Sequence, residues 1–530
     1  MRIYRSLLLV IALLLITNQT GRAQVSDNGL ISEPLAQRMG LRRQWYMQLP
    51  MNPYAEQVID VDLHVSDTEA SWEYEVVLGE ERWIFSEHDL DSFRRPQGKE
   101  AAEQLANKHY LELQREQKDA KLIPHPTPII RLAAISDQGQ VTLLDAETGR
   151  VFWKRSLGKR NQVSLGVSTS DQFTVASVGL MIYVLDNKDG STIWERKAKT
   201  IPGGPPAISE TTVFIPSIRD RVESFYLFSK DEFPGMYPSP GRVVVKPTVG
   251  STTIAWPTDK GKVYVGLISQ PKMRYRLQAH DKIVSRIAYL APSRYVATSM
   301  DGFVYCFQEV TGEVLWNFST GQQITQSATL LEDSTYVITT ENRLYCLESN
   351  TGSGKWFTRE ISRFIAASGS RIYCLDPLNR LVVLDAGTGG RILTAAAGAL
   401  DLVVHNDRTD RMYVGSKSGL IQCLREPNLQ YPIIHAGVSE RITKGEVAEE
   451  EDPAANPAGQ KPPAAAKPPA AGNNPFAPAN KPGNNPFAPG AAPKPAPKAD
   501  PFGADDPFAP AEKPAPKADP FGADDPFKNN

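Results

Sequence analysis

The feature that most constrains this chain is a short apolar run that recurs about every forty residues. The runs are rich in Val, Ile, Leu, Tyr and Phe and are bounded by turn-forming residues, which is typical of short antiparallel strands. Eight of them open at residues 139, 179, 221, 261, 302, 342, 379 and 419. Four short strands per repeat, repeated in a ring, is the pattern of a β-propeller blade. We therefore predict an all-β, eight-bladed propeller over residues 40–436, with seven blades as the alternative.

The two ends of the repeat region predict how the ring closes. The last unit, from Gly419, lacks the TGxxxW hairpin of the other units. The stretch GLRRQWYMQLP at 40–50 has the features of an isolated outer strand, with Trp45 in the place of the missing tryptophan. Because pairing these two segments would remove an exposed sheet edge, we expect the N-terminal segment to supply the last strand of the last blade.

A turn followed by tryptophan recurs in the repeat, as in DAETGRVFW at 145–153. The glycine can take the positive φ of a tight hairpin, and the Asp145 side chain can bond the following backbone. The tryptophan would fill the wedge between blades, with its indole N–H bonded to a carbonyl. The predicted blade-stapling residues are Gly149, Trp153, Gly190, Trp194, Gly312, Trp316, Gly352, Trp356 and Trp45.

An insertion at 66–128 interrupts the first blade. After a strand at 55–65, the sequence predicts a hairpin at 71–87 and a charged helix at 99–121, before the blade resumes at 129–136. Two interpretations remain open, a solvated capping excursion and a partner-binding element.

The N-terminus has the three parts of a secretory signal. Two arginines precede an apolar run at 7–16, and small residues surround a cleavage site after Ala23, so we expect a signal peptide at 1–23. An uncleaved anchor is the alternative. Since no cysteine precedes Cys306, we do not expect a lipoprotein. We predict export to the periplasm or cell envelope, without a later membrane span.

From about residue 444 the composition changes to Pro, Ala and Lys, and the predicted tail at 444–530 repeats NNPFAP and PAPKADPFGADDPF. Such a composition buries too little apolar surface to offset ordering entropy, so it predicts disorder. The tail could be a tether, a multivalent docking segment, a solubilising extension or, less in keeping with export, a ligand for eukaryotic endocytic adaptors. The candidate docking residues are Phe476, Phe487, Phe502, Phe508, Phe521 and Phe527.

The repeat resembles that of the pyrrolo-quinoline quinone (PQQ) repeat β-propellers, whose blades carry a stretch like GxLYALDAxTGxxxW. The segments at 139–153, 302–316 and 342–356 match it well, whereas 379–393 lacks the tryptophan. The family comprises quinoprotein dehydrogenases, with PQQ and calcium on the propeller axis, and non-catalytic scaffolds of the BamB type. Fold alone does not choose between these branches.

The enzyme branch implies a disulfide between adjacent cysteines against one face of the quinone and a tryptophan against the other. The four cysteines, at 306, 346, 374 and 423, include no adjacent pair. Three of them occupy equivalent sites in different blades, which we expect to be too far apart for a disulfide, so we interpret them as buried apolar residues. Repeat intervals of 37 to 42 residues also leave little room for a substrate funnel. No HExxH or CxxC motif occurs, and we assign no catalytic, cofactor-binding or metal-binding residue.

The formal net charge of -2 gives no support for nucleic-acid binding. We therefore predict an exported, monomeric, non-enzymatic scaffold of the BamB-like branch that binds envelope proteins and needs no cofactor. The alternative is a PQQ- and calcium-dependent quinoprotein oxidoreductase.

Overall fold

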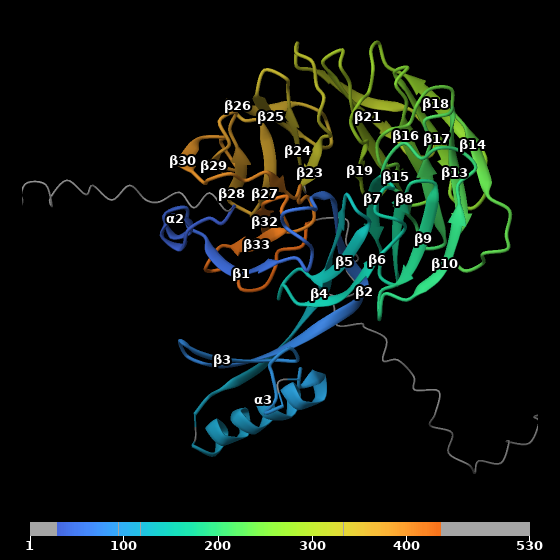
Figure 1. Ribbon diagram of the computed structural model, residues 1–530. Helices are drawn as coiled ribbons and strands as arrows, with labels where there is room; N and C mark the ends of the chain where they lie inside the picture. The colour runs from blue at the N-terminus through green and yellow to red at the C-terminus, as the bar shows by residue number, and fades with distance from the viewer. Residues whose placement is uncertain (1–28, 94, 117, 332, 436–530) are drawn as a thin grey trace, which may run out of the picture. The chain divides into compact units, whose positions relative to one another are not determined.

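The computed structural model describes residues 29–93, 95–116, 118–331 and 333–435 (Figure 1). These residues form eight antiparallel sheets that follow one another around a ring, which confirms the β-propeller. The number of sheets equals the number of apolar runs in the sequence. The expected signal peptide and the expected tail, with its six phenylalanines, lie outside the described residues.

The first four sheets are numbered here in chain order, with their strands given from the ring axis outward. Sheet 1 contains β2 (Val58–Leu78), β4 (Lys121–Ser136), β5 (Gln140–Asp145) and β6 (Val151–Ser156), with β3 (Glu81–Ser86) on the other side of β2. Sheet 2 contains β7 (Ser164–Thr169), β8 (Phe173–Val178), β9 (Met181–Asp186) and β10 (Thr192–Lys197). Sheet 3 contains β11 (Ala207–Ile208), β12 (Thr212–Pro216), β13 (Arg221–Tyr226) and β14 (Gly235–Pro238). Sheet 4 contains β15 (Thr248–Val249), β16 (Thr253–Pro257), β17 (Lys262–Leu267) and β18 (Met273–Gln278).

The other four sheets follow the same order. Sheet 5 contains β19 (Ala288–Leu290), β20 (Arg294–Thr298), β21 (Phe303–Gln308) and β22 (Val314–Ser319). Sheet 6 contains β23 (Thr329–Leu331), β24 (Ser334–Ile338), β25 (Arg343–Glu348) and β26 (Gly354–Arg359). Sheet 7 contains β27 (Arg363–Ala367), β28 (Arg371–Leu375), β29 (Arg380–Asp385) and β30 (Arg391–Ala396). Sheet 8 contains β31 (Leu402–Val403), β32 (Met412–Gly415), β33 (Leu420–Arg425) and, outermost, β1 (Arg42–Gln48).

The apolar runs of the sequence are the third strands of the sheets. In β9, β17 and β29 four consecutive residues are buried, because neighbouring sheets cover both faces of each strand. This burial explains why the runs are continuously apolar instead of alternating with polar residues. The core therefore lies between sheets, and one cluster, for example, joins Leu143 of sheet 1 to Val167 and Leu185 of sheet 2.

The ring closes as the sequence predicts. Strand β1 pairs antiparallel with β33, and Trp45 lies opposite Cys423. Both ends of the propeller therefore share sheet 8, and the outer edge of β33 is covered.

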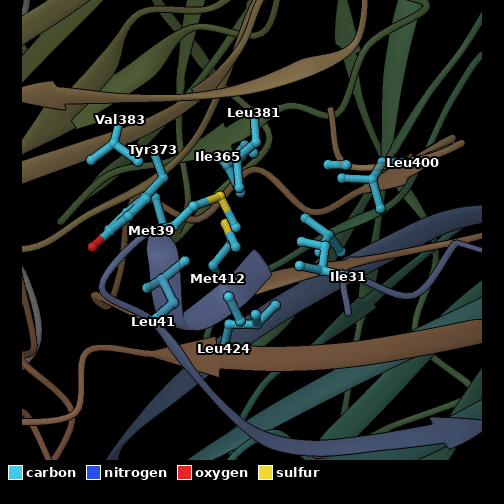
Figure 2. Close-up of a cluster of buried hydrophobic side chains, with 14 of the residues drawn as sticks. Ile31, Met39, Leu41, Ile365, Tyr373, Leu381, Val383, Leu400, Met412 and Leu424 are labelled. Atoms are coloured by element: carbon cyan, nitrogen blue, oxygen red, sulfur yellow. The ribbon is translucent and has the colours of Figure 1, made fainter. Parts of the chain in front are cut away.

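Residues ahead of β1 also belong to the fold, although the sequence places the start of the domain at residue 40. Ile31, Met39 and Leu41 flank or follow the short helix α2 (Glu33–Arg38), and they are buried against sheets 7 and 8. Figure 2 shows Ile31 near Leu400, and Met39 with Leu41 near Met412. Leu393 of β30, which replaces the tryptophan in sheet 7, packs against the same cluster. The N-terminal segment thus fills the junction that lacks an aromatic residue.

The insertion differs from its predicted form in two ways. Strand β2 runs without interruption from the ring into the insertion, where the sequence suggests a separate strand and hairpin; only a register shift between Val65 and Ala70 marks the boundary. Helix α3 (Gly98–Arg115) ends earlier than predicted, and β4 begins at Lys121. The prolines at 124, 126 and 128 exclude a helix there, and they are tolerated in a strand because β5 pairs only with residues 131–135 of β4.

Within the described residues, neither helix has the length and apolar character needed to cross a membrane.

Candidate functional site

The predicted stapling tryptophans lie on the fourth strands, and each indole reaches the next sheet. Trp153 Nε1 donates to the carbonyl of Asn187 at 2.9 Å, and Trp45 Nε1 donates to that of Ala146 at the same distance. The remaining indoles make the same kind of bond, from Trp194 to Leu227 at 2.7 Å, from Trp316 to Ser349 at 3.1 Å and from Trp356 to Ala386 at 3.2 Å. This geometry joins adjacent sheets, while the energetic role of these residues stays a prediction.

The predicted turn glycines lie directly beneath these rings. Gly149 has a φ of +72°, and a Cβ at this position would come within 2.6 Å of the Trp45 ring. The corresponding neighbours are Trp153 for Gly190, Tyr275 for Gly312 and Trp316 for Gly352. The turn therefore requires glycine both for its positive φ and for the close approach of the ring.

Sequence reasoning missed two members of this set, Tyr237 and Tyr275. Tyr275 lies fourteen residues after Gly261, as Trp153 does after Gly139, so its spacing could have revealed it. Its hydroxyl donates to the Glu309 carbonyl at 2.9 Å. The Tyr237 hydroxyl donates to the Leu267 carbonyl at 2.6 Å, but an insertion shifts this residue out of the regular spacing.

The structure also brings together a group of charged residues that sequence reasoning did not single out. They come from the first strands of the sheets and the loops beside them, and seven of the eight sheets contribute to one cavity of about 440 Å³. Only the axis of the ring is close to that many sheets. The charged residues and histidines lining this axial cavity are Asp60, Asp62, His64, Lys246, Arg286, His405, Asp407 and Arg408.

Two aspartates of β2 face sheet 2 at the axis. Asp60 Oδ2 accepts a bond from the Val167 N–H at 2.9 Å, and Asp62 Oδ2 accepts one from the Thr169 N–H at 2.9 Å. These N–H groups belong to β7, whose axial edge has no strand partner. The alternation DVDLH was a signal for this arrangement, because residues two apart on a strand share one face.

The electrostatics of the pair Asp62 and Lys246 differ from those of Asp60. Burial by itself raises the pKa of Asp62, but the Lys246 ammonium, which bonds its Oδ1, acts together with the Thr169 N–H and Arg286 to hold that pKa below its ordinary value. Asp60 has no such contact, and burial raises its pKa to about 6 against the opposing effects of the Val167 N–H and Lys246. Asp62 is therefore a fixed anion, whereas Asp60 titrates near neutrality.

The axial residues do not fit PQQ and calcium. Lys246 and Arg286 could face the carboxylates of a quinone, but Asp62 is already paired with Lys246. No Phe, Tyr or Trp of the described residues lines the axial cavity to stack on a flat ring. Among the described residues, no group of three or more His, Cys, Asp or Glu residues is arranged to hold a metal ion. We derive no chemistry through the quinone.

The cysteines lie away from the axis. All four are free and buried, which confirms that they form no disulfide. Cys306 and Cys346 are on third strands, opposite Trp316 and Trp356. Burial raises the pKa of Cys306 to about 11, so this thiol stays protonated at neutral pH. Cys306, Cys346 and Cys423 therefore pack behind tryptophans, whereas Cys374 lies on the second strand β28, opposite Phe364 and Val382.

Four-stranded sheets around an axis, with an aromatic residue on most fourth strands bonded to the turn of the next sheet, define a PQQ-repeat β-propeller. Within this class, the family model described as "Outer membrane protein assembly factor BamB" matches residues 137–267 and 276–421, more than half of the chain. The protein belongs to this family.

Solved structures resemble this fold. BamB from Moraxella catarrhalis is 17% identical in sequence with a TM-score of 0.47, and the match covers 56% of this chain and 93% of that one. The computationally designed Ika8 protein is 14% identical with a TM-score of 0.44, over 55% of this chain and 92% of that one. No curated protein sequence matches the chain.

Proposed function

We propose that the protein is an exported, non-enzymatic scaffold that binds proteins of the bacterial cell envelope. Its family is described by a role in outer-membrane protein assembly, which supports a partner-binding function. The poor fit of the axial residues to PQQ and calcium favours a role without catalysis. We infer further that it is exported to the periplasm or cell envelope, since the N-terminal sequence has the pattern of a cleaved signal. Our proposal includes a monomer that works there without a cofactor or a lipid anchor.

The observation that carries this proposal is the insertion, which forms a module of its own beyond the ring (Figure 1). The module consists of β3, the distal parts of β2 and β4, and α3. It has a separate core, in which Tyr74 and Val76 of β2 pack against Ala102, Ala106 and Leu113 of α3. Because the strands continue from sheet 1 without a break, the module is held by backbone pairing rather than by a flexible linker.

The surface of the module presents apolar side chains that its own core does not use. Leu105 and Leu111 of α3 are 44% and 50% exposed, and Leu90 and Phe93 in the preceding loop are 64% and 78% exposed. A solvated cap would gain nothing from these side chains, whereas a protein-binding surface commonly carries them. We therefore favour the partner-binding interpretation of the insertion.

Removing the module tests the proposal. Val65 and Ile130 lie opposite each other, so an Asn-Gly turn can replace residues 66–129 and close β2 and β4 as a hairpin. We expect the shortened protein to keep its fold and to lose envelope proteins that co-purify with the full chain, as quantified by mass spectrometry.

Point variants test the contact surface of the module without removing the module. The double change Leu105→Glu and Leu111→Glu should cause the same loss, whereas Val163→Glu and Leu378→Glu, on exposed propeller sites, should not. A second variant without residues 444–530 tests the proposed docking by the six tail phenylalanines. If the co-purifying proteins were the same for the full chain and for both deletions, neither element would be a docking site.

A further inference from the structure

The axis of the propeller holds two neighbouring cavities that share a wall. One is the axial cavity of about 440 Å³, and the other, of about 360 Å³, lies toward sheets 5 and 6. Arg286 precedes β19, while His405, Asp407 and Arg408 lie between β31 and β32. These four residues line both cavities. Cavities of this size accommodate small ligands.

Most charges around this wall are already paired. Lys246 contacts Asp62, His64 Nε2 lies 2.6 Å from Asp171 Oδ1, and Arg408 Nε lies 3.5 Å from Asp407 Oδ1. Arg294, at the far side of the second cavity, bonds Asn350 Oδ1 at 3.0 Å. The other carboxylates that line the two cavities are Asp60 in the axial cavity and Asp333 in the second cavity.

Arg286 differs from the other cations that line the two cavities. Its side chain makes one hydrogen bond, from Nε to Thr248 Oγ1 at 3.3 Å. No carboxylate of the described residues lies within the 4.0 Å of a salt bridge to its guanidinium. Arg286 is an exposed residue that lines the axial cavity, so its side chain is open to water there. The two terminal nitrogens of its guanidinium are thus available to a ligand.

We propose that Arg286 binds a carboxylate or phosphate group of a small anionic ligand at the wall between these cavities. The planar guanidinium can donate two parallel bonds to such an oxyanion. The Thr248 hydroxyl accepts the hydrogen bond from Arg286 Nε and so helps to hold the Arg286 side chain in place.

The carboxylates around the site make the binding depend on pH. Asp60 is the carboxylate of this cluster that titrates near pH 6, because burial raises its pKa. When the pH falls through this value, Asp60 takes up a proton and loses its negative charge. The net charge of the residues that line the axial cavity then rises by one. Burial lowers the pKa of His405, which opposes protonation of this histidine over the same range. Affinity for an anion of constant charge should therefore rise as the pH falls.

Calorimetric titration of the full chain with sodium sulfate, sodium phosphate and sodium oxalate tests this site at low ionic strength. Sulfate keeps its charge near neutrality, so it reports the pH effect, and the comparison of phosphate with oxalate identifies the preferred group. We expect saturable binding that Arg286→Gln weakens by at least about tenfold, because the neutral amide lacks both the charge and the bidentate contact. Arg286→Lys keeps the charge without the planar fork and should give an intermediate affinity.

Arg359→Gln is the matched control, because Arg359 is exposed on β26, far along its sheet from the axis. Since Arg286 has no carboxylate partner, Arg286→Gln should melt close to the unchanged protein, and ligand-free melting checks this. Equal affinity of the unchanged protein and Arg286→Gln, or no saturable binding of any of the three anions, would overturn the proposal. The variant without residues 66–129 should bind anions normally, so this test can fail or succeed independently of the scaffold proposal.

Discussion

At the scale of single residues, the same side chain solves the same packing problem at several junctions of the ring. Trp153 and Trp194 are 7% and 5% exposed, and each indole N–H is satisfied by a carbonyl of the next sheet. A large aromatic ring fills the space between two twisted sheets, and its one polar atom does not remain unpaired. The turn glycine beneath the ring completes the contact.

Truncation of these tryptophans should destabilise the protein. We expect each of Trp153→Ala, Trp194→Ala, Trp316→Ala and Trp356→Ala to lower the free energy of unfolding by roughly 3–5 kcal/mol, because each leaves a cavity between sheets. Urea denaturation followed by tryptophan fluorescence and circular dichroism measures the loss.

One control separates the effect of the apolar ring from that of its hydrogen bond, and a second control truncates an exposed ring. Trp153→Phe keeps most of the apolar ring and loses the donor, so it should lower stability by less than Trp153→Ala. Phe357→Ala removes a ring that is 54% exposed and should change stability by no more than about 0.5 kcal/mol. Near-normal stability of all four tryptophan variants would contradict a stapling role.

At the scale of elements, the N-terminal segment fills the space beside sheet 7 that a tryptophan fills at other junctions. Sheet 7 has Leu393 where other sheets have an aromatic residue, and α2 with its flanking residues covers the resulting gap. Ile31 and Leu41 are 0% and 1% exposed, so they are as deeply buried as residues of the central strands.

Shortening these side chains should affect the fold as strongly as a core mutation. We expect Ile31→Ala and Leu41→Ala each to lower the free energy of unfolding by about 2–5 kcal/mol, because both side chains are fully buried. Gln37→Ala, on the exposed side of α2, is the control and should have little effect. If both apolar variants unfolded at the denaturant concentration of the unchanged protein, the segment would not be part of the core.

The insertion contains elements that the sequence predicts and one strand whose full length it does not predict. Its hairpin and helix were predictable, because the strand pattern at 71–87 and the run of helix-forming residues after 98 are local signals. The continuity of β2 was not, since residues 66–69 are polar and have the composition of a loop. The strand continues because β4 pairs with it on both sides of the register shift, which is a tertiary effect.

At the scale of the whole molecule, the ring brings residues from sheets far apart in the chain to one axis. Asp60, Lys246 and Arg286 lie between 40 and 226 residues from one another in sequence, yet they line one cavity. Their arrangement has cations and hydroxyls but no stacking residue or group of metal ligands among the described residues.

This arrangement predicts the absence of quinoprotein turnover. When the purified protein is mixed with PQQ, calcium and an alcohol or a sugar, we expect no reduction of a redox dye above the level of the free quinone. An Arg286→Gln sample shows whether the quinone binds merely as an anion at the proposed site. Sustained dye reduction that depends on the protein would establish the oxidoreductase alternative and refute the non-enzymatic function.

The sequence by itself determined the repeat, the strand class, the closing strand with Trp45 and the aromatic positions with regular spacing. These features are local, because a strand buried on both faces needs an apolar run and a tight turn needs glycine. Only the tertiary structure decided that Ile31 and Leu41 pack at sheet 7, that Tyr237 takes the place of a tryptophan in sheet 3, and that charged residues meet at the axial cavity. Each of these depends on which distant strands become neighbours, and the closure of the ring fixes that choice.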